Sequence, residues 1–523
     1  RLANRWDFGV AFSGGGTRSA SCSLGQMRAL HRLGLDRRIR YIGAISGGSW
    51  FAVPYTYLPS RIPDDQWLGL HQEPSTLDWE VARRIDGMSG TLARQLTRSE
   101  VLFVALREVA RKHFASRFRV TVPVIDVEIG LTDFDEIFSQ AIESVFLDEL
   151  GLAGDRYAAW TASADVADIV ARHRDQTAVT NPRLTAADFV AVDKDRPYLV
   201  VNGAMNQDAG KVPDSSTRSV ASQLGLLAFD HVEFTPRYSG VPTPGRGRLG
   251  FATGGGYVEN IGFDTWLTVP KSGDRYTVSP GKRSHRFSLR DMMGTSGAAP
   301  AYVVHALKPD WGPGLPSSIL DVFPEFCHWP VVRGSEPVTV ERPFGDGGYV
   351  DNYGIVPLLK RGVSSIIVFV NTDTPLEEGV DGWQARIAVD RQLPTFFGVR
   401  VPDVLADDLM SPSVFTSSDR MLGAGQGQVF AGGYGETIRG LLQTKALANT
   451  RVRTGPAPVG RLSQADVDRL IAPEGSRPAT WVGKIRGPTY HLGRYETVDN
   501  AFFGIKGGRR VRVLWVYNEA SRA

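Results

Sequence analysis

Cysteine and long apolar runs are what this sequence most clearly lacks. Cys22 and Cys327 are the only cysteines among 523 residues, so disulfides do not hold the fold together and no zinc-binding spacing exists. No apolar run approaches the roughly 18 residues that a membrane-spanning helix needs. These absences argue against a disulfide scaffold, a zinc module and an integral membrane protein, and we expect a cytoplasmic or peripheral membrane location.

Strong charge of either sign is also missing. The formal net charge is +3 and the isoelectric point is near 8.7, which leaves no footprint for nucleic acid but permits weak attraction to anionic lipid surfaces. With 42% hydrophobic residues the chain can bury a large core, and its length suggests two to four domains. We therefore expect a globular protein that does not bind nucleic acid.

A glycine-rich segment follows the first apolar run of the chain. Residues 8–12 predict a short strand, and residues 13–18, SGGGTR, lead into apolar residues at helical spacing that end before Gly34. Backbone amides of such a loop at a helix N-terminus favour negative charge. The loop is suited to an oxyanion hole or to a phosphate, although it lacks the lysine of a nucleotide-binding P-loop.

A second strand–turn–helix pattern contains a serine. Residues 40–45 predict a strand, and Ser46 is followed by two glycines and a helix-compatible stretch. The pattern is similar to the nucleophile elbow G-x-S-x-G, in which small neighbours permit a strained turn that exposes the serine hydroxyl. Ala44 stands where that pattern has its first glycine.

A third glycine-rich segment lies three hundred residues further on. Asp346 stands between glycines in the run FGDGGYVDN, ahead of a helical stretch and a strand predicted at residues 365–371. By itself an aspartate between glycines is more typical of a β-turn than of a catalytic base, and Asp351 and Asn352 are typical of turns or helix caps. The occurrence of all three segments in one order is what favours a site.

Together the motifs SGGG-x-R, SGGSW and DGG resemble those of the patatin-like phospholipases, most closely the catalytic domain of the cytosolic group IV phospholipases A2. Residues 294–300, GTSGAAP, are similar to the patatin SAAP segment, and residues 232–238, VEFTPRY, to a stretch of the group IV enzymes. Taken alone, Thr295 and Ser296 are typical of a helix start. The likeness covers residues 8–58 and patches between 197 and 371.

The resemblance implies a serine–aspartate dyad, with Ser46 as nucleophile and Asp346 as general base. None of the nine histidines lies in the three segments: His31 lies between the first two, and His305 and His328 precede the third. An ordinary aspartate, with a pKa of about 3.9, is a weak base for a serine hydroxyl. We therefore expect burial to raise the pKa of Asp346, and the two side chains to lie within hydrogen-bond reach.

The same resemblance implies the groups that bind substrate. The oxyanion-hole residues are Gly14, Gly15, Gly16 and Gly47, and Arg18 matches the arginine near the substrate phosphate. No cofactor and no metal ion is implied. The implied activity is lipid degradation: a phospholipid or lysophospholipid is cleaved at a fatty-acyl ester through an acyl-enzyme, and the need for a protein activator stays open.

For the fold we expect an α/β protein with a three-layer core like that of patatin and cytosolic phospholipase A2. Its mainly parallel central sheet would carry the site at the carboxyl ends of the strands. Residues 1–60 and 195–375 form the two parts of this catalytic core, the second with Asp346. Residues 61–194 are predicted to be a mainly helical insertion and a candidate lid, and residues 376–523 add to the core or form a cap.

Two helices are predicted within the insertion. Residues 132–136 carry acidic groups typical of a helix start, ahead of an apolar stripe that includes Phe138 and Val145. These acids resemble a metal cluster, but helix-start chemistry explains them. Residues 102–114 form a second apolar stripe flanked by basic residues, a pattern shared by ordinary packed helices and helices that lie on a membrane.

Other functions remain open at this stage. An acyltransferase or a non-phospholipid esterase would use the same dyad and differ in its products. A non-catalytic lipid-binding module would keep the pocket but leave Ser46 unreactive toward a fluorophosphonate. A nucleotide-binding protein would hold phosphate at the glycine loop and leave Ser46 incidental.

Overall fold

The structure is a computed structural model of the chain. It describes residue 2 and residues 5–69, 137–175, 184–193, 195–206, 229–245, 252–268, 277–281, 285–298, 324–331, 338–378, 387–390, 392–399, 427–454 and 488–519.

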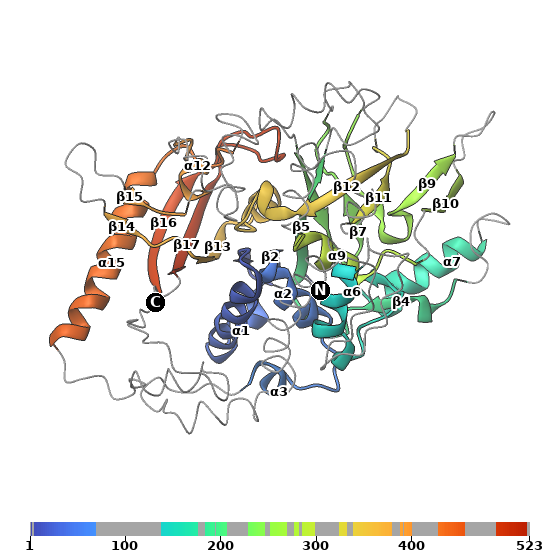
Figure 1. Cartoon of the computed structure of the whole chain (residues 1–523), viewed down its shortest axis with the longest axis horizontal. Helices are drawn as coiled ribbons and strands as arrows, with labels where there is room; N and C mark the ends of the chain where they lie inside the picture. Colours follow the sequence, from blue (N-terminus) through green and yellow to red (C-terminus); the bar gives the residue numbers. More distant parts are fainter. Residues whose placement is uncertain are drawn as a thin grey trace, which may run out of the picture.

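Five parallel strands form the centre of a large sheet (Figure 1). In spatial order they are β17 (Arg510–Glu519), β13 (Ser365–Thr372), β1 (Phe8–Phe12), β2 (Tyr41–Ile45) and β5 (Tyr198–Asn206). Because the strands are parallel, their carboxyl ends meet at one edge, and the loops after β1 and β2 emerge there side by side. The α/β fold with a parallel central sheet is therefore confirmed.

Antiparallel strands extend this centre on both sides. On one side, β16 (Thr489–Glu496) pairs with β17. On the other side, β5 is followed in order by β6 (Phe229–Phe234), β7 (Tyr238–Gly240) and β8 (Val258–Glu259). The second half of β5 also pairs with β12 (Val340–Asp346), which in turn pairs with β11 (Glu325–His328).

Helices cover both faces of the parallel strands and make three layers (Figure 1). In β1, Val10 and Phe12 belong to the core on one face and Ala11 to the core on the other, as the two-residue period of a strand requires. No helix within the described ranges has the length and apolarity to cross a bilayer.

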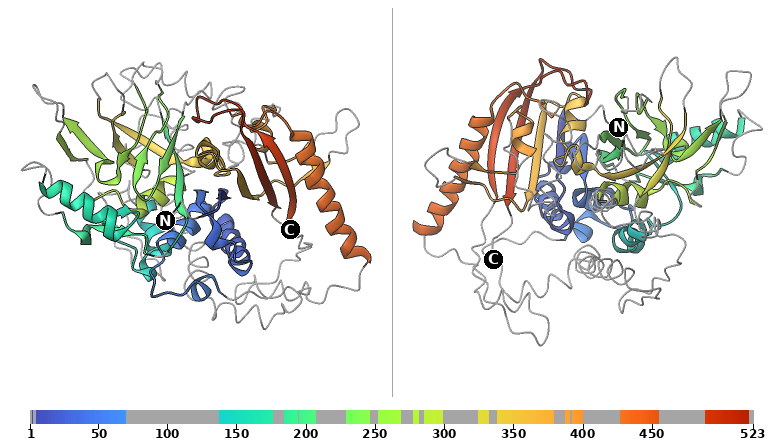
Figure 2. Two further views of the ribbon diagram at one scale, coloured as in Figure 1. Left: turned by 180° about the vertical axis from the view of Figure 1, so that it is seen from behind. Right: turned by 45° about the horizontal axis from the view of Figure 1, so that its top comes forward.

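The two helical layers come from different parts of the chain, and Figure 2 shows them from two further directions. The first face packs helices from the N-terminal half and the middle of the chain, and the second packs helices that follow β12. On the first face lie α1 (Gly16–Arg32), α2 (Gly47–Tyr57), α6 (Ile137–Phe146) and α9 (Leu289–Ser296); on the second lie α11 (Val356–Lys360), α12 (Gln392–Thr395) and α15 (Tyr434–Thr454).

The described part of the insertion is mixed and not wholly helical. Besides α6 it contains α3 (Asp64–Leu68) and α7 (Ala167–Asp175), together with a small parallel pair of strands, β3 (Tyr157–Ala159) and β4 (Phe189–Ala191). Phe138, Ala141, Ile142 and Val145 of the predicted stripe are buried, which confirms that helix. The acidic residues predicted ahead of α6, and the stripe at residues 102–114, lie outside the described residues.

The C-terminal region contributes strands to the central sheet. β17 pairs with β13 along eight residue positions, from Ser365↔Arg512 to Thr372↔Glu519, and β16 forms a hairpin with β17. Within residues 376–523, the described stretch 489–519 thus forms two strands of the central sheet. Four short strands complete the description: β9 (Thr265–Thr268), β10 (Thr277–Pro280), β14 (Glu377–Glu378) and β15 (Ile387–Ala388).

Candidate active site

Ser46 lies on a strained turn between β2 and α2. Its backbone has φ 49° and ψ −128°, a conformation that residues with a side chain rarely adopt. The next residue, Gly47, touches the glycine loop so closely that a Cβ atom there would lie 1.8 Å from the carbonyl oxygen of Gly16. The strained serine and the glycine behind it are thus the geometry expected of a nucleophile elbow.

The glycine loop packs against this elbow. Gly15 and Gly16 have φ values of 133° and 58°, which glycine tolerates without strain, and α1 begins at Gly16. Their amides make no hydrogen bond to the described residues, and neither does the amide of Gly47. By contrast, the Gly14 amide donates to the carbonyl of Asn352 at 2.9 Å. The Gly14 amide is therefore already satisfied, whereas those of Gly15, Gly16 and Gly47 are unpaired among the described residues.

Strand β5 brings Asp346 to the elbow across three hundred residues. Ile45, the last residue of β2, pairs with Asn202 of β5. Asp346, the last residue of β12, pairs with the next residue of β5, Gly203. The strands β2 and β12 therefore end head to head on the same side of β5, and the residues at their ends meet.

The carboxylate of Asp346 is buried and faces the Ser46 hydroxyl. Asp346 is 5% exposed, and its Oδ1 accepts a hydrogen bond from the Gly348 amide at 2.7 Å. Burial raises the pKa of Asp346 to about 7; the bonds from the Gly348 amide and the Ser46 hydroxyl lower it, but by less. The Ser46 hydroxyl thus bonds a carboxyl group whose pKa burial raises to near neutrality.

Close backbone packing explains why a glycine, Gly347, follows Asp346. A Cβ atom on Gly347 would lie 2.5 Å from the carbonyl oxygen of Asn202, so only glycine lets the loop pass this strand.

The turn interpretation of Asp351 is confirmed, because its carboxylate accepts from the amides of Tyr353, Gly354 and Val356 at 3.0 Å each. Asp351 holds the loop that follows Asp346 and does not reach Ser46.

The sequence analysis missed Ser296, which holds the elbow from behind. Its Oγ accepts a hydrogen bond from the Ser46 amide at 2.9 Å and donates to the carbonyl of Asn202 at 2.7 Å. The prediction that Thr295 and Ser296 start a helix is wrong. α9 begins after Ser288, whose side chain forms a capping box with Asp291, and Ser296 is its last residue. The GTSGAAP motif was the available signal, since it stood out for its resemblance and not for its helix propensity.

Arg18 lies on the first turn of α1, beside the end of β13. One nitrogen of its guanidinium donates to the Asn371 carbonyl at 3.3 Å, and another lies 4.0 Å from Asp373. Its Nε is buried without a hydrogen-bond partner among the described residues, and the side chain is 37% exposed. Arg18 is thus held near the loop while part of its fork is still free.

Histidine takes no part in the contact between Ser46 and Asp346 within the described ranges. The His31 ring bonds Asp36 at 2.7 Å and Asp65 at 3.1 Å, at the far end of α1. His305 lies outside the described residues. The His31 ring thus pairs with two carboxylates and does not bridge Ser46 and Asp346.

One group of side chains has metal-like spacing among the described residues. Ligand atoms of His31, Asp36 and Asp64 lie within 4.8 Å of one another. Both His31 nitrogens already bond carboxylates, and the Arg196 guanidinium donates to both Asp64 oxygens at 2.5 and 3.2 Å. The group is therefore charge-paired by its own residues and lies away from Ser46.

Three comparisons with known proteins were made. No family model and no curated protein sequence matches. Among solved structures, human GIVD cytosolic phospholipase A2 shares 12% identity, covers 83% of this chain and has a TM-score of 0.37. The same human protein in complex with methyl gamma-linolenyl fluorophosphonate gives 12% identity, 83% coverage and a TM-score of 0.31. The chain spans about three fifths of the length of those structures, 62% and 58%.

Proposed function

We propose that this protein is a serine acyl hydrolase that cleaves fatty-acyl esters of phospholipids or lysophospholipids. One observation carries the proposal: a serine hydroxyl on a strained turn contacts a buried carboxylate whose pKa is near 7. A serine needs a turn that presents its hydroxyl and an adjacent base to attack an ester. Ser46 and Asp346 supply these two requirements.

Asp346 acts as the general base. A base works best when its pKa lies near the working pH, because it is then largely deprotonated and still accepts a proton readily. An aspartate at its ordinary pKa would fail the second condition. Burial of Asp346 moves its pKa to about 7 and so fits it to this role.

The glycine amides stabilise the oxygen that becomes negative. Gly15, Gly16 and Gly47 carry amides that make no other hydrogen bond to the described residues, and they flank Ser46. Each donor aimed at an oxyanion contributes about 2.7–4 kcal/mol to transition-state stability in acyl-transfer enzymes. Gly14 is left out of this set because its amide already donates to Asn352.

The reaction proceeds in two steps. Asp346 takes the Ser46 proton as Ser46 Oγ attacks the ester carbon; the ester bond breaks, and the alcohol leaves with the proton from Asp346. Water then gives a proton to Asp346 and attacks the acyl-serine, and Ser46 regains its proton as the fatty acid leaves. Arg18 binds the phosphate through the free part of its fork, so Arg18→Lys should reduce turnover of phospholipids more than that of uncharged esters.

The test combines covalent labelling with product analysis. Ser46→Ala and Asp346→Asn should each lower fatty-acid release from mixed phospholipids by at least about 10³-fold, measured by mass spectrometry. A fluorophosphonate should label the wild-type protein at Ser46 and leave Ser46→Ala unlabelled. Ser21→Ala is the matched control, because Ser21 is an exposed serine on α1 that bonds only the Thr17 carbonyl. Wild-type turnover by Asp346→Asn, or an unreactive Ser46, would contradict the proposal.

A further inference from the structure

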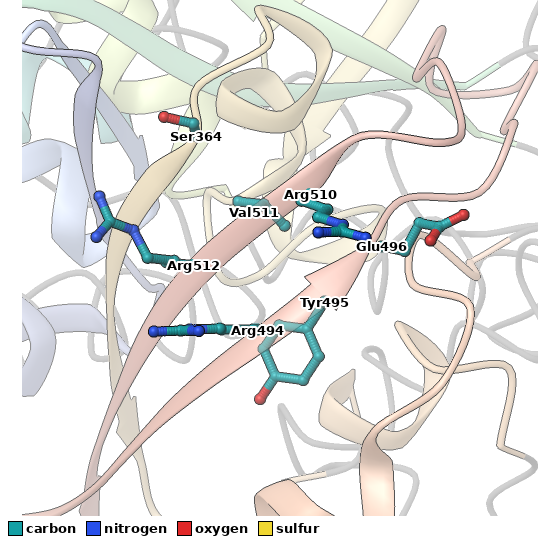
Figure 3. A pocket seen from close by; sticks show the side chains of 7 residues that line it. All are labelled: Ser364, Arg494, Tyr495, Glu496, Arg510, Val511 and Arg512. Carbon is teal, nitrogen blue, oxygen red and sulfur yellow. The ribbon is translucent and has the colours of Figure 1, made fainter.

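An open pocket lies on the β16–β17 hairpin, away from the candidate active site. Its volume is about 620 Å³, and Figure 3 shows the side chains that line it. Arg512 pairs with Ser365 at the amino end of β13, whereas the glycine loop follows Phe12, which pairs with Phe369 towards the other end. The pocket therefore lies at the opposite edge of the sheet from Ser46. The lining residues are Ser364, Arg494, Tyr495, Glu496, Arg510, Val511 and Arg512.

The charge of this lining is positive. Three arginines and one glutamate give a net charge of +2. The backbone amide of Ser364 donates to Asp7 at 3.0 Å, and Asp7 also lies 3.8 Å from Arg40, so this neighbouring acid already has a cation of its own. No ion pair within 4 Å joins Arg494, Arg510 or Arg512 to an acidic group of the described residues.

Two of the arginines occupy directly opposed positions. Arg494 of β16 pairs in register with Arg512 of β17. Figure 3 shows the two guanidinium groups extending side by side in one direction, while the Glu496 carboxylate points away from them. Like charges at directly opposed positions of two strands destabilise a sheet unless something neutralises them. A bound anion would remove this cost.

The arginine pair is also partly positioned for a ligand. Arg512 donates to the Ser365 hydroxyl at 2.8 Å, which fixes the direction of its fork. Arg494 makes no hydrogen bond or ion pair with the described residues, so its donors are available. Planar guanidinium groups bind phosphate oxygens two at a time, and the Ser364 hydroxyl supplies a further donor.

We propose that this pocket binds a phosphate-bearing anion between Arg494 and Arg512. The volume lies within the range of small-molecule sites, so the group that carries the phosphate fits as well. The site goes beyond the proposed hydrolase function and shares no residue with it. Phosphate-bearing headgroups of lipids and soluble phosphate compounds offer the same chemistry, and the experiment separates them.

The first test uses inorganic phosphate and pyrophosphate with the full chain. Calorimetry and thermal melts at constant ionic strength should show binding that sodium chloride does not reproduce. Arg494→Gln and Arg512→Gln should each weaken the affinity about tenfold or more, because each removes a charge-assisted contact. Glu496→Gln should strengthen binding. Arg439→Gln, an exposed arginine on α15, is the charge-matched control and should leave binding unchanged.

Two further measurements check that the variants fold and identify which kind of compound carries the phosphate. Without phosphate, Arg494→Gln should melt at or above the wild-type temperature, since it relieves the like-charge pair. Vesicles of phosphatidylcholine with phosphatidic acid should retain the protein through Arg494 and Arg512 if the source is a lipid headgroup, whereas binding confined to pyrophosphate identifies a soluble ligand. Binding that persists in the double variant, or that chloride reproduces, would overturn the proposal. Hydrolysis by Ser46 can fail or succeed without changing any of these results.

Discussion

Burial, at the scale of the single residue, determines what Asp346 can do. Its carboxylate receives a bond from one amide and contacts one hydroxyl, which by themselves would lower its pKa. Loss of hydration outweighs both and raises the pKa to about 7. The same side chain on a surface loop would be ionised throughout the physiological range and would accept a proton poorly.

The pH dependence of hydrolysis should reflect this pKa. The base form of Asp346 is the deprotonated carboxylate, so kcat/KM should fall as the pH drops through about 7. Initial rates with a soluble ester between pH 5 and 9 would measure the midpoint. An acid limb centred near pH 4 would show instead that the carboxyl ionises as an ordinary aspartate.

Asp346→Asn should make the folded protein more stable at neutral pH while removing its activity. Because the folded pKa lies above the ordinary 3.8, ionisation of Asp346 lowers the free energy of unfolding as pH rises from about 4 to about 7. The variant escapes this loss, which is about 1.4 kcal/mol for each pH unit of the displacement. Urea unfolding should show a larger advantage at pH 8 than at pH 5, and an equal advantage at both values would contradict the raised pKa.

Ser296→Ala should slow catalysis without direct contact with substrate. It leaves the buried Ser46 amide without its acceptor, a cost of about 1–3 kcal/mol that loosens the elbow. We expect kcat to fall about tenfold or more with KM nearly unchanged, together with slower fluorophosphonate labelling of Ser46. Thr295→Val is the matched control, because the Thr295 hydroxyl is buried without a hydrogen-bond partner among the described residues and its loss costs little. Equal kinetics in both variants would exclude a positioning role for Ser296.

At the scale of the element, the site depends on how closely two turns approach. The glycine loop after β1 and the elbow after β2 lie next to each other because their strands are adjacent and parallel. Glycine is required where they touch: a Cβ atom on Gly48 would lie 2.6 Å from the Phe12 carbonyl oxygen. The positions of the glycine loop and of Ser46 are thus set by one packing contact.

Gly47→Ala should separate the two turns. The added methyl group would overlap the Gly16 carbonyl, so the backbone must move, at a cost of about 1–3 kcal/mol or more, and the oxyanion donors move with it. Thermal melts and ester hydrolysis should both decline. Gly25→Ala is the control: apart from the neighbouring backbone of its own helix, no atom lies within 4 Å of its Cβ position, and alanine inside α1 should stabilise by about 0.5–1 kcal/mol. A fully active Gly47→Ala protein would contradict the packing described here.

For the whole molecule, the end of the chain completes the core behind the site. Trp515 of β17 is fully buried in the second helical layer, where its ring lies 6.2 Å from that of Tyr353, just after the aspartate loop. Residues far apart in the sequence thus support the same layer. Removal of strand β17 would leave the backbone edge of β13 unpaired.

Trp515→Ala should destabilise the whole protein by about 3–5 kcal/mol, because it empties a large buried site. Urea unfolding measures this loss. Leu492→Ala in the same hairpin is the control; Leu492 is 61% exposed on the opposite face, and its truncation should change the free energy of unfolding by no more than about 0.5 kcal/mol. Similar losses in the two variants would mean that the buried face of the hairpin does not carry its stability.

Some features of this protein follow from the sequence by itself. Local steric limits and the spacing of apolar residues predict two strands, at residues 8–12 and 365–371, and the turn at Ser46 with the helix after it. The structure has all of them nearly where expected. Glycines beside a serine permit few backbone conformations, so such turns are legible without tertiary information. The α/β class follows from the alternation of these elements.

Only the tertiary structure decided which of the local signals meet. The register of β5 places Ser46 beside Asp346. Ser296 lies at the end of a helix and not at the start that its local sequence predicts, and it bonds the Ser46 amide. The Gly14 amide donates to the Asn352 carbonyl. Each of these depends on strands and loops hundreds of residues apart, where local propensity carries no information. The same holds for the pKa of Asp346, because burial is a property of the packed chain and not of its neighbours in sequence.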